Sequence, residues 1–124
     1  MTSLTINSEI PKRGEIWLVN FDPTVGTEIK KVRPAIVISS DAAGKLPIKL
    51  VAPVTDWKPY FAKNFWHVQI EPDKEIGITK ASAINILQLR GMDLQRFIRE
   101  LGNISKSKMA EITIAILTTI EYEI

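Results

Sequence analysis

Short apolar runs, separated by proline and glycine, dominate the chain from residue 10 to residue 104. Runs of this length, rich in β-branched residues and bounded by turn formers, predict strands. Strands are expected at residues 15–21, 34–40, 48–55, 65–70 and 82–90, with a brief further strand at residues 97–101. A series of short strands without intervening helices predicts a small barrel or sandwich rather than alternating β and α units.

The hydrophobic period changes near the carboxyl terminus. Gly102 and Asn103 are expected to break the chain, and either Ser105 or Ser107 can cap a following helix. Apolar residues then recur every three or four positions, as on one face of an amphipathic helix. These residues are Met109, Ile112, Ile116 and Ile120, with Ile114 and Leu117 widening the stripe. So wide a stripe predicts burial against the sheet or a partner. On so small a protein it also amounts to more apolar surface than one chain covers, which predicts a homodimer.

Composition restricts the chemistry that this chain can carry. Its 124 residues fit one domain, and it contains no cysteine and a single histidine, His67. The absence of cysteine excludes disulfides, thiol catalysis and cysteine-based metal sites. A single histidine excludes a two-histidine acid–base pair within one chain, and its apolar neighbours are typical of a packed or surface strand residue. We therefore expect neither a cofactor nor a metal ion.

No apolar run reaches the roughly 18 residues of a membrane-spanning helix. The first ten residues lack the basic and apolar segments of a targeting signal. We therefore expect a cytoplasmic protein without a membrane partner. We divide the chain into an amino-terminal extension at residues 1–10 and a single domain at residues 11–124.

Positive charge is concentrated in the first half of the chain, where residues 11–50 carry seven Lys and Arg against four Asp and Glu. The densest group lies between two predicted strands and contains Glu28, Lys30, Lys31 and Arg33. Such a cluster is either a solvated basic face or a contact surface for nucleic acid.

Arg33 directly precedes a predicted buried strand, so the sheet should hold its guanidinium in place. A planar fork of N–H donors held in this way suits a phosphate group. Thr55 ends the next predicted strand and would place a hydroxyl at a strand terminus. An arginine beside a hydroxyl can clamp a phosphate or an oxyanion.

An aromatic loop follows Thr55 and contains Trp57, Tyr60 and Phe61, flanked by Lys58 and Lys63. Single-stranded nucleic acid is bound by stacking on aromatic rings as well as by charge. This loop therefore either stacks bases beside the phosphate clamp or packs as a lid on the sheet.

Several segments together resemble the MazF/PemK (Kid) family of toxins. They are Pro11-Lys12-Arg13-Gly14-Glu15-Ile16-Trp17, the pattern Gly26-x-Glu28-x4-Arg33-Pro34-Ala35-Ile36-Val37-Ile38-Ser39, and Pro53-Val54-Thr55. Ser82, followed six residues later by Gln88-Leu89-Arg90, extends the similarity. The segments follow the family's order and spacing from about residue 11 to residue 120. Two features depart from the pattern: Asp56 stands where many members have a small residue, and residues 1–10 have no counterpart.

The resemblance implies a mainly β (α+β) fold, an SH3-like small β-barrel with a carboxyl-terminal helix, which the toxin CcdB also resembles. It further implies the toxin of a type II toxin–antitoxin system. Such a toxin is a homodimer, is inhibited by a cognate antitoxin, and is a sequence-selective endoribonuclease acting on single-stranded RNA. The alternative is a non-catalytic toxin of the CcdB kind, or a nucleic-acid-binding module on the same fold.

The resemblance also assigns candidate site residues. Arg33 and Thr55 match the family's central active-site pair, and Glu28 matches a loop carboxylate used by some members. Candidate RNA-binding residues are Lys30, Lys31, Trp57, Lys58, Tyr60, Ser82 and Gln88.

Metal-independent cleavage lets the ribose 2′-OH attack its own phosphate, leaving a 2′,3′-cyclic phosphate and a 5′-OH. Because an arginine pKa exceeds about 12, Arg33 suits charge stabilisation better than proton abstraction. Thr55 would donate a hydrogen bond to a phosphate oxygen, and Glu28 would accept the 2′-OH proton.

Ordinary structural roles remain open for the same residues. Arg33 could pair with Glu28 across the strand, Thr55 could be a plain strand residue, and Glu28 could be solvated. Ser82 and Gln88 are either polar residues of the sheet or part of an RNA groove.

Overall fold

The computed structural model describes residues 10–123, so residues 1–9 of the expected amino-terminal extension lie outside the described residues. The chain forms a mainly antiparallel β structure with a carboxyl-terminal helix, which confirms the expected fold class. The strands are β1 (Glu15–Asn20), β2 (Val32–Val37), β3 (Ile48–Asp56), β4 (His67–Ile70), β5 (Ser82–Asn85), β6 (Arg90–Asp93) and β7 (Phe97–Asn103). The helix is α2 (Lys106–Thr119), and short 3-10 turns are η1 (Asp41–Ala43), η2 (Pro59–Lys63), η3 (Lys74–Ile76), η4 (Ile86–Gln88) and η5 (Leu94–Arg96).

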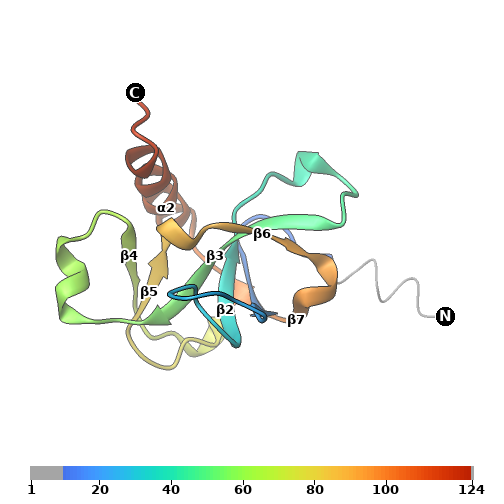
Figure 1. The fold of residues 1–124 in the computed structure, drawn as a ribbon, viewed down its shortest axis with the longest axis horizontal. Helices are drawn as coiled ribbons and strands as arrows, with labels where there is room; N and C mark the ends of the chain where they lie inside the picture. Colours follow the sequence, from blue (N-terminus) through green and yellow to red (C-terminus); the bar gives the residue numbers. More distant parts are fainter. Residues whose placement is uncertain (1–9, 124) are drawn as a thin grey trace.

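The seven strands form one sheet in the order β4-β5-β3-β2-β1-β7, with β6 pairing beside β3 (Figure 1). The nine-residue strand β3 is the centre of this arrangement. Its first half pairs with β6 and its second half with β5, while β2 runs along its middle. The sheet is barrel-like but open, since β4 and β7 at its two ends do not pair within residues 10–123.

Apolar residues cover both faces of the central strands. In β2, Ile36 packs into one buried cluster, whereas its neighbours Ala35 and Val37 pack into a second cluster on the opposite face. Successive residues of a strand point to opposite faces, so burial on both sides produces continuous apolar runs. This arrangement explains why the strands appear in the sequence as unbroken hydrophobic segments.

Helix α2 packs against β4 and η4 at one side of the sheet (Figure 1). Ser105 caps it, because its hydroxyl oxygen accepts a hydrogen bond from the Lys108 N–H at 3.1 Å. The helix buries Ile112 and Ala115, but Ile114 is 58% exposed and Ile120 is 65% exposed. The apolar stripe buried within one chain is therefore narrower than expected. None of the described helices is long and apolar enough to span a membrane.

Two local expectations were wrong. The run at residues 82–90 is not one strand, because β5 pairs with the second half of β3 and β6 with its first half. The chain must turn between β5 and β6 to reach the two halves of β3. The turn is made by η4, whose sequence contains no glycine or proline that would predict it. Gly102 and Asn103 do not break the chain either, since they end β7 and pair with Ile16 and Glu15.

Candidate active site

Arg33 and Thr55 line the same cavity of about 170 Å³. Arg33 pairs with Val19 in the β1–β2 ladder, which fixes its backbone within the sheet. The β2–β3 register pairs Ala35 with Pro53, and continuing it by two residues places Arg33 opposite Thr55. The start of one strand and the end of its antiparallel neighbour thus meet at one edge of the sheet. The remaining lining residues are Pro34, Val54, Asp56, Gly77, Ile78, Thr79, Lys80 and Ser82.

Both polar groups are available to a ligand. The Arg33 Nε donates to the Lys30 carbonyl oxygen at 3.4 Å, a long hydrogen bond. Ion pairs within residues 10–123 join Lys80 to Asp56 and Lys108 to Glu111, so the alternative pairing of Arg33 with Glu28 is not formed. Both residues are half-buried, and a guanidinium and a hydroxyl that line one cavity can bind a phosphate from two directions.

Glu28 lies in an adjoining cavity rather than beside Arg33 and Thr55. This second cavity, also about 170 Å³, is lined by Phe21, Glu28, Ile29, Pro53, Leu87, Gln88, Leu89 and Arg90. The Glu28 carboxylate accepts a hydrogen bond from the Val25 N–H at 2.8 Å. Pro53, which lines this cavity, and Thr55, which lines the first, are two residues apart on β3, about 7 Å along the strand.

Gln88 is engaged with the loop that carries Glu28. Its side-chain oxygen accepts a hydrogen bond from the Ile29 N–H at 2.6 Å, and its amide nitrogen donates to the Thr27 carbonyl oxygen at 3.2 Å. Ser82 is buried at the edge of the first cavity, where its hydroxyl donates to the Lys80 carbonyl oxygen at 2.8 Å.

The aromatic loop after Thr55 packs largely on itself. The rings of Trp57 and Phe61 meet edge to face at 5.8 Å, and Phe61 stacks on His67 with centroids 3.7 Å apart. His67 also shares a 3.1 Å hydrogen bond with the Asn64 amide, and burial lowers the pKa of its imidazole. Tyr60 remains 67% exposed, so its ring is the one presented to solvent.

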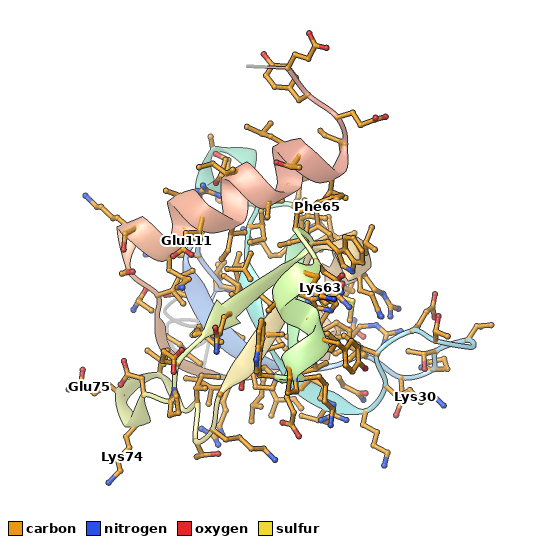
Figure 2. The ribbon with its side chains drawn as sticks, turned by 90° about the vertical axis from the view of Figure 1, so that its left-hand side faces the viewer. Lys30, Lys63, Phe65, Lys74, Glu75 and Glu111 are labelled. Carbon is orange, nitrogen blue, oxygen red and sulfur yellow. The ribbon has the colours of Figure 1, made fainter. Side chains whose placement is uncertain are left out.

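The three predicted RNA-binding lysines, Lys30, Lys31 and Lys58, are all exposed. Figure 2 shows Lys30 on a loop that projects away from the sheet, whereas Lys63 lies on the turn beneath the helix. Lys80 lines the Arg33–Thr55 cavity but was not predicted from the sequence. A single lysine in a loop has no recognisable sequence pattern. The pairing of its neighbours Ala81 and Ser82 with Trp57 and Asp56 brings it to the site.

Comparison with known proteins places this fold and these residues in a family. Residues 12–120 match the family described as PemK-like, MazF-like toxin of type II toxin-antitoxin system. A protein named endoribonuclease MazF from Staphylococcus epidermidis is 36% identical over 102 residues, which cover 82% of this chain and 83% of that protein.

Solved structures show the same fold at lower identity. The crystal structure of MazF from Deinococcus radiodurans superposes with a TM-score of 0.73 at 22% identity, covering 90% of this chain and 97% of that one. An endoribonuclease from a mycobacterial species, solved in complex with its cognate antitoxin, has a TM-score of 0.72 at 15% identity and covers 93% and 99% of the two chains. With its match over residues 12–120, the chain belongs to the PemK-like, MazF-like family of type II toxin–antitoxin toxins.

Proposed function

We propose that this toxin is a metal-independent endoribonuclease that cleaves single-stranded RNA at a phosphate held between Arg33 and Thr55. The observation that carries the proposal is the single cavity lined by both side chains. The 36% identical relative that bears the name endoribonuclease supports it independently.

In this mechanism, the ribose 2′-OH attacks the adjacent phosphorus and the bond to the 5′ oxygen breaks. The products are a 2′,3′-cyclic phosphate and a 5′-OH. Arg33 stabilises the charge that develops on the phosphorane oxygens, and its guanidinium can donate a proton late to the leaving oxygen. The Thr55 hydroxyl donates a hydrogen bond to a non-bridging oxygen.

Glu28 is the proposed acceptor of the 2′-OH proton. The nucleotide that supplies the 2′-OH lies directly beside the scissile phosphate, and β3 contributes Pro53 to the Glu28 cavity and Thr55 to the Arg33–Thr55 cavity. An RNA strand that spans both cavities with its 5′ side toward Glu28 would carry its nucleophile on the side of the carboxylate.

The remaining candidate residues would follow the RNA on either side of these cavities. Lys30, Lys31 and Lys58 supply exposed charge for backbone phosphates. Tyr60 supplies an exposed ring for stacking, and both Tyr60 and Trp57 contact the ring of Phe61 edge to face. Ser82 and Gln88 line the two cavities, although their polar groups are already bonded within the protein.

A cognate antitoxin is the proposed protein partner, since structurally similar toxins have been solved with theirs. We also propose a homodimer, because Ile114 on α2 and Ile120 directly after it expose apolar surface that one chain does not cover. Light scattering at micromolar concentration would show a dimer if this is correct and a monomer if it is not. An RNA-cleaving toxin of this kind would act in the cytoplasm.

Incubation of the purified protein with a long RNA in EDTA tests the proposed activity. Discrete fragments ending in 2′,3′-cyclic phosphate should appear with the natural chain and disappear with Arg33→Ala. Intact RNA in the presence of folded protein would overturn the nuclease and favour a non-catalytic toxin or binding module. Cleavage that stops in EDTA and returns with added metal would overturn the metal-independent mechanism.

A further inference from the structure

Lys80 lines the Arg33–Thr55 cavity, and hydrogen bonds to the backbone of residues 80 and 81 hold it in this position. The buried Ser82 hydroxyl donates to the Lys80 carbonyl oxygen at 2.8 Å. The Trp57 N–H donates to the Ala81 carbonyl oxygen at 3.0 Å, and Ser82 itself pairs with Asp56 in the β3–β5 ladder. The short segment that carries Lys80 is therefore tied to the strand that carries Thr55.

Lys80 forms an ion pair with Asp56, an acidic residue that lines the same cavity. Its Nζ lies 3.1 Å from the Asp56 carboxylate, and both residues line the cavity with Arg33. The Lys80 side chain is 68% exposed and that of Asp56 is 49% exposed. Exposed ion pairs contribute little to stability, so this one can open at small cost. Without RNA, the Asp56 carboxylate therefore takes the place on Lys80 that a second phosphate bound at the cavity could take.

We propose that Lys80 is a second cationic ligand for the RNA, binding a backbone phosphate next to the scissile one, and that Asp56 is its competitor within the protein. This inference rests on the proposed function. When RNA binds, its phosphate takes the place of the Asp56 carboxylate on Lys80. Asp56 thereby lowers the affinity of the toxin for RNA, both by occupying Lys80 and by placing a negative charge in a phosphate-binding cavity.

Salt dependence of RNA binding tests the role of Lys80. A single-stranded RNA with 2′-O-methyl groups at every ribose lacks the nucleophile, so its binding can be followed by fluorescence anisotropy without cleavage. Each phosphate contact in a single strand contributes about 0.7 to the slope of log affinity against log salt. Lys80→Ala should reduce the slope by about this amount. The natural chain should then lose about two- to threefold more affinity than the variant between about 50 and 200 mM salt.

Lys45→Ala is the matched control, because it removes the same charge from an exposed loop residue that lines neither cavity. Its salt slope should equal that of the natural chain. An unchanged slope for Lys80→Ala, or an equal reduction by Lys45→Ala, would overturn the proposal. Both lysines are exposed, so neither variant removes a buried contact.

Asp56→Asn tests the competition. It should tighten RNA binding by up to about fivefold, the equivalent of one exposed ion pair. The gain should shrink when Lys80→Ala is already present. The same gain in both backgrounds, or none in either, would overturn the role of Asp56 as competitor for Lys80. Failure of the proposed function is seen separately, as absence of cleavage of unmodified RNA by the natural chain.

Discussion

The Gln88 side chain joins two segments that lie about 60 residues apart in the chain, since its oxygen accepts a 2.6 Å hydrogen bond from the Ile29 N–H. Its amide nitrogen donates to the Thr27 carbonyl oxygen at 3.2 Å. The two bonds hold the loop on either side of Glu28, the residue that lines the second cavity. The position of this carboxylate therefore depends on η4, at the other side of the cavity.

Gln88→Ala should release the Glu28 loop. Losing these two hydrogen bonds should lower the free energy of unfolding by about 1–2 kcal/mol. Trypsin should then cut faster after Lys30 and Lys31 in native conditions, which mass spectrometry of the fragments would show. Gln95→Ala is the control, because that exposed side chain makes no hydrogen bond within the described residues. Equal rates of trypsin cutting in both variants would show that the two Gln88 hydrogen bonds do not hold the Glu28 loop.

Gly102→Ala should destabilise the protein, because a Cβ at this position would lie 2.8 Å from the Glu75 carbonyl oxygen and 3.0 Å from the Ile76 Cα. Both atoms belong to backbone that cannot move aside easily. Overpacking of this kind costs about 1–3 kcal/mol, which chemical denaturation would measure. Gly91→Ala is the comparison, because its Cβ would meet only the end of the Ile48 side chain. Equal losses in the two variants would contradict the close packing of β7 on η3.

Stability should fall on acidification because of His67. Burial lowers the pKa of its imidazole from the ordinary value of 6.5, so the unfolded chain binds this proton more readily than the folded one. Stability therefore rises with pH between the folded pKa and about 6.5, and is lost as the pH falls through that window. Thermal denaturation between about pH 7.5 and about pH 5.5 would show the loss.

His67→Phe is the informative variant for this effect, since it keeps a ring against Phe61 but removes the titration. The fall in melting temperature on acidification should be smaller in the variant. Burial and the neighbouring Glu15 raise the pKa of Glu100, which works in the opposite direction at lower pH. Both proteins retain Glu100, so their difference isolates His67. An identical pH dependence in both would contradict the effect.

The strand content and the meeting of Arg33 with Thr55 follow from local sequence. Arg33 precedes one apolar run and Thr55 ends the next, and antiparallel neighbours bring those two positions to the same edge. The contribution of Lys80 could not be predicted, because the Trp57–Ala81 hydrogen bond and the β3–β5 pairing determine where it lies.

Other features escaped prediction for related reasons. The break between β5 and β6 depends on which half of β3 each strand pairs with, and Leu- and Ile-rich sequence does not specify that choice. Gly102 was expected to interrupt the chain, whereas its small size serves the close contact with η3. In both cases the deciding interaction is made with residues far away in the sequence.

Single-turnover cleavage of one RNA by the natural chain, Arg33→Ala, Thr55→Val and the double variant tests the central claim most directly. Removing one donor to a developing oxyanion costs about a hundredfold or more in rate, so each single variant should be strongly impaired. Groups that act as a unit on one phosphate are non-additive, so the double variant should be little slower than Arg33→Ala. Near-natural rates for either folded single variant, or losses that simply multiply, would contradict a shared phosphate between Arg33 and Thr55.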